Sequence, residues 1–166
     1  MGSILSTPFL VIGHILLYYD LRLRKDGVSV ETIAGELNIE PGLRIKNVWE
    51  DFSNEAFTLY QQGQFLEAAQ KLQDALKAAE LSLGSEHIDV AAILRNLAGL
   101  FEAQGKYAEA EPFYKRELKI REKVLGPDHP DVATVCENMA KCYRNMGKKD
   151  EAEVLEARAK QIQSKR

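Results

Sequence analysis

An internal repeat with a period of 42 residues constrains the fold of this chain more than any other feature of its sequence. Gly63, Gly105 and Gly147 mark the period, since each glycine lies 42 residues after the one before it. One alanine precedes each glycine by seven residues and another follows it by five: Ala56, Ala98, Ala140, Ala68, Ala110 and Ala152. Self-similarity at a fixed period of this length predicts a stack of similar units, each packed against its neighbours.

Each unit is expected to contain two helices. In the middle unit, apolar residues follow helical spacing before the glycine, at Ile93, Leu97, Leu100 and Phe101. The glycine then ends this first helix, because glycine readily adopts the positive φ of a helix C-terminus. A second helix is predicted over residues 106–125. Gly126 and Pro127 close it, and Pro130 begins the next helix, where a missing backbone N–H carries no penalty.

Small residues are expected where the two helices of a unit cross, because a small side chain lets the backbones approach closely. The alanines that flank each glycine fit this role. A further alanine follows the glycine by twelve residues in two units, at Ala75 and Ala159, but Glu117 occupies that position in the middle unit. In the third unit, Glu156 replaces an expected large apolar residue. The repeat is therefore regular in its small residues and irregular at positions that carry these two carboxylates.

The units resemble tetratricopeptide repeats of the kinesin light chain type, which are longer than the usual repeat. The resemblance is carried by residues 96–98 (Asn-Leu-Ala), 104–116 (Gln-Gly-Lys-Tyr-Ala-Glu-Ala-Glu-Pro-Phe-Tyr-Lys-Arg) and 125–133 (Leu-Gly-Pro-Asp-His-Pro-Asp-Val-Ala). It covers about residues 46–163. It implies an all-α fold, an α-solenoid of about three helix-turn-helix repeats, and a protein–protein interaction adaptor that binds an extended peptide in its concave groove.

Three regions are predicted along the chain. Residues 46–166 form the tetratricopeptide-repeat domain. Residues 27–45 form a linker with a short helix over residues 31–37, which is followed by the helix-breaking pair Pro41 and Gly42. Residues 1–26 form a hydrophobic helix with a basic flank.

The N-terminal region contains a marginal candidate for a membrane span. Residues 3–19 carry no charged side chain, and a helix needs about 17 to 20 apolar residues to cross a bilayer. Arg22, Arg24 and Lys25 follow directly, and such charges stay on the cytoplasmic side. The pattern predicts membrane association through residues 3–19, with the repeat domain in the cytoplasm. The alternative is a buried hydrophobic helix in a soluble cytoplasmic protein.

Residues 8–37 also resemble the last span and cytoplasmic tail of certain bacterial multi-pass membrane proteins. The stretch from Leu16 to Gly27, which includes Tyr-Tyr-Asp-Leu-Arg, carries this resemblance. The spans that would precede it are missing here. The segment is therefore interpreted either as a lone anchor or as the remnant of a truncated gene.

Charge and motif content argue against several classes of function. The formal net charge is −3, from 22 basic and 25 acidic residues, whereas a nucleic-acid binder would carry a basic surplus or stripe. The sequence has no phosphate-binding loop, dinucleotide fingerprint or nucleophile elbow. We therefore expect neither enzyme activity nor a cofactor, and a protein or peptide partner rather than a nucleic acid.

The histidines and cysteines of the repeats are expected to be structural. His87 and His129 are repeat equivalents, and a metal site would need more ligands close by. We expect them to pack against or cap the helix that follows. Cys136 and Cys142 lie six residues apart, which suits neither a metal-ligand pair nor a disulfide within one helix. Cys136 falls on a predicted core position, and two free cysteines fit a reducing compartment.

Three asparagines follow the same period and are the first candidates for a binding site. Asn54, Asn96 and Asn138 each lie nine residues before a repeat glycine, although asparagine is a weak helix former. The family resemblance implies that this position faces the groove. A side-chain amide there offers both a donor and an acceptor to a peptide backbone. The alternative is an amide that bonds the neighbouring repeat.

Residues at helical spacing from these asparagines complete the predicted groove. Its N-terminal part would be aromatic, through Phe57 and Tyr60, and its C-terminal part basic. The full predicted set is Asn54, Phe57, Tyr60, Arg95, Asn96, Asn138, Lys141, Arg144 and Asn145. It predicts an extended peptide with an acidic part and an apolar anchor. The alternatives are a solvated face on a structural or self-associating repeat protein, or a truncated membrane-protein fusion without a peptide ligand.

Overall fold

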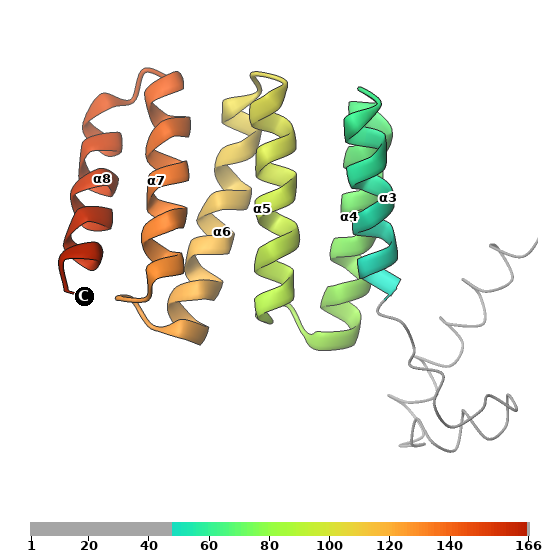
Figure 1. Ribbon diagram of the computed structural model, residues 1–166, viewed down its shortest axis with the longest axis horizontal. Helices are drawn as coiled ribbons and strands as arrows, with labels where there is room; N and C mark the ends of the chain where they lie inside the picture. The colour runs from blue at the N-terminus through green and yellow to red at the C-terminus, as the bar shows by residue number, and fades with distance from the viewer. Residues whose placement is uncertain (1–47, 166) are drawn as a thin grey trace, which may run out of the picture. The chain divides into compact units, whose positions relative to one another are not determined.

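The computed structural model describes residues 48–165, and these residues form three helix-turn-helix pairs that stand side by side (Figure 1). The pairs are α3 (Val48–Gln61) with α4 (Phe65–Leu83), α5 (Ile88–Ala103) with α6 (Tyr107–Leu125), and α7 (Pro130–Asn145) with α8 (Lys149–Ser164). Contacts within each pair are supplemented by contacts of α4 with α5 and of α6 with α7. The predicted all-helical architecture is confirmed for these residues, and the arrangement is consistent with an α-solenoid.

The predicted hydrophobic helix of residues 1–26 and the linker of residues 27–45 lie outside the described residues. The membrane span proposed for residues 3–19 therefore stays a prediction. Among residues 48–165, no helix combines the length and the apolar character that crossing a membrane requires.

The repeat glycines end the first helix of each pair, as predicted. Gly63, Gly105 and Gly147 have φ angles of 76°, 71° and 78°, in the left-handed region that disfavours a side chain. In the middle repeat, the N–H of Gly105 donates to the carbonyl of Glu102 over 2.8 Å, and that of Lys106 to the carbonyl of Phe101 over 2.9 Å. These bonds satisfy carbonyls that the end of the helix would leave without partners, and the chain turns directly into the next helix.

Histidine caps begin the first helix of the second and third pairs. The Nδ1 atom of His87 accepts the backbone N–H of Asp89 over 3.2 Å, and that of His129 accepts the N–H of Asp131 over 3.1 Å. Each cap satisfies a helix N–H that lacks an intrahelical partner. The prediction that these histidines cap the following helix is therefore confirmed.

The alanines of the repeat lie in the core of the helix pairs. Ala56, Ala98, Ala140, Ala68, Ala110 and Ala152 are all buried, as are Ala75 and Ala159. Cys136 and Cys142 are buried as well, which confirms the predicted core position of Cys136. Burial raises the pKa of Cys142 to about 11. The thiol therefore stays protonated near neutral pH and behaves as a small apolar group.

A carboxylate on α6 ties the second helix pair to the third. Glu111 accepts hydrogen bonds from Lys115 over 2.6 Å, from Lys148 over 2.9 Å and from the Tyr143 hydroxyl over 3.0 Å. Hydrogen bonds from the two lysines hold the pKa of Glu111 down to about 2. Lys148 also lies over the Tyr143 ring, 5.0 Å from its centroid. Polar contacts thus fix the turn between α7 and α8 against the preceding repeat.

The cap at His129 supports a test of the helix boundary. We expect His129→Ala to lower the free energy of unfolding by about 1 kcal/mol, because the N–H of Asp131 loses its acceptor. His129→Asn should keep most of the stability, since asparagine is a preferred N-cap residue. Chemical denaturation followed by circular dichroism measures both. Equal losses for the two variants would show that the cap bond does not account for the effect.

Candidate functional site

An open groove of about 420 Å³ runs along the first two helix pairs and reaches the third at Asn138. We call it the central groove. It is lined by Ser53, Ala56, Phe57, Tyr60, Ala68, Leu72, Arg95, Asn96, Gly99, Leu100, Glu102, Tyr114 and Asn138. These residues come from α3, α4, α5, α6 and α7. The structure thus brings together Phe57, Tyr60, Arg95, Asn96 and Asn138 from the set that the sequence predicted.

The remaining predicted residues lie elsewhere. Asn54 lines a second hollow of about 310 Å³, which it shares with Asn96 and with Trp49 near the start of α3. Lys141, Arg144 and Asn145 on α7 line neither hollow. The candidate site is therefore centred on the first two helix pairs and reaches the third through Asn138.

The groove asparagines have side-chain amides that are available to a ligand. Asn96 is exposed and Asn138 half-buried, and neither amide makes a hydrogen bond within residues 48–165. The alternative role, a bond to the neighbouring repeat, is thus not observed in this part of the chain. Gly99 lies beside Asn96 on α5, and an added Cβ there would meet no atom within 4 Å. The groove is open next to the amide.

The aromatic end of the groove presents apolar surface to solvent. Phe57 is 61% exposed and Tyr60 is 41% exposed. The Tyr60 ring packs edge-on against Phe65 of α4, with centroids 5.6 Å apart, and buried Leu72 also lines the groove here. Exposed aromatic rings offer a large contact area for an apolar group.

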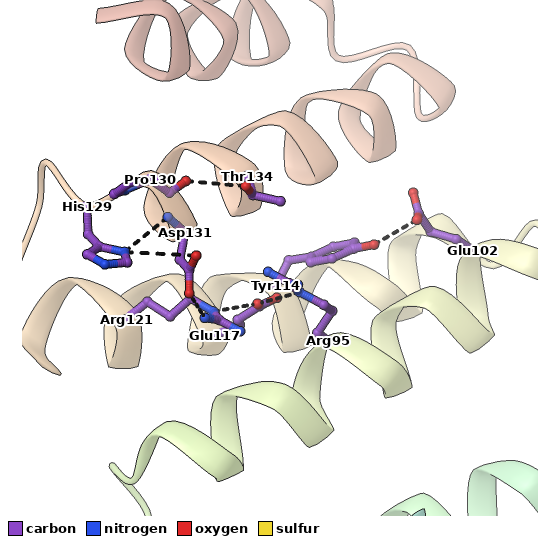
Figure 2. A network of polar contacts seen from close by, with 9 residues as sticks. All are labelled: Arg95, Glu102, Tyr114, Glu117, Arg121, His129, Pro130, Asp131 and Thr134. Atoms are coloured by element: carbon purple, nitrogen blue, oxygen red, sulfur yellow. Dashed lines mark hydrogen bonds and ion pairs between the residues drawn. The ribbon is translucent and has the colours of Figure 1, made fainter. Parts of the chain in front are cut away.

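Arg95 is held by the carboxylate of Glu117 (Figure 2), and Glu117 is fully buried. The Nε atom of Arg95 donates to Oε1 of Glu117 over 2.9 Å, and Arg121 donates to the same oxygen over 2.8 Å. Arg121 also donates to Asp131 over 2.7 Å. These four residues carry two positive and two negative charges. The network, with Glu117 at the position that is alanine in the other repeats, therefore compensates the charge of Arg95.

Arg144 is also paired with a carboxylate on the helix that follows it. Its Nε and Nη2 atoms donate to the two oxygens of Glu156 over 2.6 and 2.8 Å. This bidentate pair raises the pKa of Arg144 and lowers that of Glu156. Of the three basic residues expected in the groove, Lys141 is the one with no ion-pair partner among residues 48–165. The expected basic end of the groove thus depends on Lys141, which lines neither hollow.

One pair of equivalent positions is occupied by side chains of different chemical character in each of the three repeats. Glu102 on α5 corresponds to Tyr60 and Arg144 in the other repeats, and its partner Tyr114 on α6 corresponds to Leu72 and Glu156. The Tyr114 hydroxyl donates to Oε2 of Glu102 over 2.7 Å (Figure 2). Burial and this hydrogen bond raise the pKa of Tyr114, so its hydroxyl stays a donor.

Helical spacing places Glu102 beside Asn96 on the predicted groove face, but the predicted set of site residues left it out, although it lines the central groove. The repeat alignment could have identified Glu102 as a site residue, because an acid stands there where the other repeats have an aromatic residue and a base. The repeat alignment could not predict the hydrogen bond between Glu102 and Tyr114 of the next helix, since this bond depends on how the two helices pack.

The buried and the exposed ion pairs should contribute differently to stability. We expect Glu117→Ala to lower the free energy of unfolding by about 3 kcal/mol, because it leaves buried Arg121 without one of its two carboxylates. Glu156→Ala should cost much less, since Arg144 is exposed and water can replace its partner. Urea unfolding curves compare the two variants. A loss for Glu156→Ala as large as that for Glu117→Ala would contradict this assignment.

Comparison with known proteins identifies the repeat. A family model described as a tetratricopeptide repeat matches residues 52–123 and 89–165. No curated protein matches the chain.

Solved structures with the same repeat are similar to this chain. BtubC (BKLC) from P. vanneervenii is 25% identical with a TM-score of 0.68, over 95% of this chain and 64% of that protein. A Podosopora anserina protein of kinesin light chain type, with nearly identical TPR-like repeats, is 27% identical with a TM-score of 0.62, over 72% of this chain and 56% of its own. The Arabidopsis FLU TPR domain is 19% identical with a TM-score of 0.60, over 71% and 96% of the two chains, and shows the likeness in fold.

This chain spans less than two thirds of the length of the first two relatives. The predicted resemblance to tetratricopeptide repeats of the kinesin light chain type is confirmed by the family model and by these relatives. Such domains are generally protein–protein interaction modules and are typically non-enzymatic scaffolds. The chain belongs to the tetratricopeptide repeat family.

Proposed function

We propose that this protein is an adaptor that binds an extended segment of a partner protein in the central groove. The observation that carries the proposal is the pair Asn96 and Asn138. Both residues line the groove, and neither side-chain amide has a hydrogen-bond partner among the described residues. An extended peptide brings N–H and C=O groups that need partners, and a side-chain amide can serve both kinds of group.

An apolar side chain of the bound segment would pack against Phe57 and Tyr60. These rings are exposed in the free protein, so a ligand side chain laid on them removes apolar surface of both molecules from water. Buried anchors of this kind commonly carry most of the binding energy at an interface, while the surrounding contacts set its orientation. The asparagines would thus fix the ligand backbone and the aromatic rings would hold one of its side chains.

An acidic ligand residue would gain less from the groove than the sequence suggested. Arg95 is compensated by Glu117 and Arg144 by Glu156, so a ligand carboxylate there would compete with a carboxylate already in place. The proposal therefore keeps the extended segment and the apolar anchor. Tethering to a membrane through residues 3–19 stays a prediction from the sequence.

Affinity capture tests the proposed groove. The full chain is immobilised and exposed to lysate of the source cell, with Asn96→Ala/Asn138→Ala beside the wild type. The segment of the captured protein that binds is then identified, and the dissociation constant of its complex with each variant is measured. Two lost hydrogen bonds of about 1 kcal/mol each should weaken binding by tenfold or more.

Asn145→Ala is the matched control. Asn145 is an exposed asparagine on α7 that lines neither hollow, so its removal should leave the captured segment bound. If the double variant retains the same proteins as the wild type, or if neither retains any, the chain is not a groove-binding adaptor. Either outcome would favour a structural or self-associating repeat protein.

A further inference from the structure

We infer that the segment bound in the central groove carries a lysine or arginine that pairs with Glu102, close to the apolar residue that packs on Phe57 and Tyr60. The inference rests on the proposed function and names the chemistry of its ligand. It differs from the sequence-based expectation, in which the ligand carried an acidic residue.

The charges that line the central groove are not balanced. Arg95 and Glu102 are the charged residues in its lining. The Arg95 guanidinium already pairs with the buried Glu117 carboxylate over 2.9 Å. Glu102 has no cation within ion-pair distance among residues 48–165, and its one hydrogen-bond donor there is the neutral Tyr114 hydroxyl. The groove therefore keeps one uncompensated negative charge, which complements a basic side chain.

The hydrogen bonding of Glu102 leaves one acceptor unused. Oε2 accepts from Tyr114, whereas Oε1 is shielded from water and has no donor in the described structure. A shielded acceptor without a donor is unfavourable. Glu102 as a whole is half-buried and lines the groove, so a ligand cation that approaches it from the groove displaces no protein cation and gains a charge-assisted interaction with the carboxylate. Tyr114 is 2% exposed and belongs to the core. The carboxylate is therefore held in place before a ligand arrives.

The repeat places this acid directly after the aromatic end of the groove. Tyr60 and Glu102 hold the same position in successive repeats, and both line the central groove. A segment that crosses from the first repeat to the second would meet an aromatic surface and then a carboxylate. The third repeat has Arg144 at this position, already paired with Glu156. The apolar and basic ligand residues should thus be near neighbours in the bound segment.

Selection from a synthetic peptide array tests this inference. The probes are immobilised ten-residue peptides with one leucine or phenylalanine and, at each other position in turn, lysine, arginine, glutamate or glutamine on an alanine–serine background. The full-length wild type should retain peptides with lysine or arginine near the apolar residue about tenfold better than their glutamine counterparts. Raised salt should reduce this difference, because it screens the charge pair.

Glu102→Gln should remove the preference for a basic residue while still accepting the Tyr114 hydroxyl bond. Glu109→Gln is the matched control, because Glu109 is an exposed carboxylate on α6 outside the groove lining, and it should keep the preference. Circular dichroism verifies that both variants are folded. Equal retention of lysine and glutamine peptides by the wild type, or a preference for glutamate, overturns the inference.

Asn96→Ala separates this inference from the proposal on which it rests. If that variant weakens all retained peptides but the wild type shows no basic preference, the groove binds peptides and the assignment to Glu102 is wrong. If the wild type retains no peptide in a manner that depends on Asn96, the proposed function fails and this inference fails with it.

Discussion

The close crossing of two helices on small side chains is the constraint from which the rest of this structure follows. Ala68, Ala110 and Ala152 are fully buried at equivalent positions of α4, α6 and α8. Because these side chains are small, the backbones of a pair approach closely and the side chains around the crossing meet their partners. The stacking of three such pairs then places residues of α3, α5 and α7 along one groove.

The middle repeat departs from this pattern of small buried residues, and the departure determines the charge of the groove. Glu117 stands in an alanine position and is fully buried, so it requires cations. Arg95 and Arg121 supply them. One consequence is that Arg95 lines the groove with its charge compensated. The uncompensated charge in the groove is then that of Glu102, about two helical turns further along the same face of α5.

Sequence periodicity predicted the features that depend on position along the chain. The period and helical spacing predicted the glycines that end helices, the buried alanines and the caps at His87 and His129. They also predicted that Asn96 and Asn138 share one face. The partners of Arg95, Arg144 and Glu102 could not be predicted in this way. Each lies on the following helix, and the pairing depends on the packing of the two helices and on side-chain rotamers, which a one-dimensional pattern does not contain.

The proposed function requires that the face lined by Asn96 and Asn138 is the binding surface. The most direct measurement is the side-chain amide spectrum of the full chain, labelled with ¹⁵N and titrated with the captured partner segment. We expect the Asn96 and Asn138 side-chain NH₂ resonances to shift and to saturate with binding, while those of the exposed residues Gln70 on α4 and Asn145 on α7 stay unchanged. Shifts confined to Gln70 and other outward residues of α4, α6 and α8, with Asn96 and Asn138 unaffected, would contradict it.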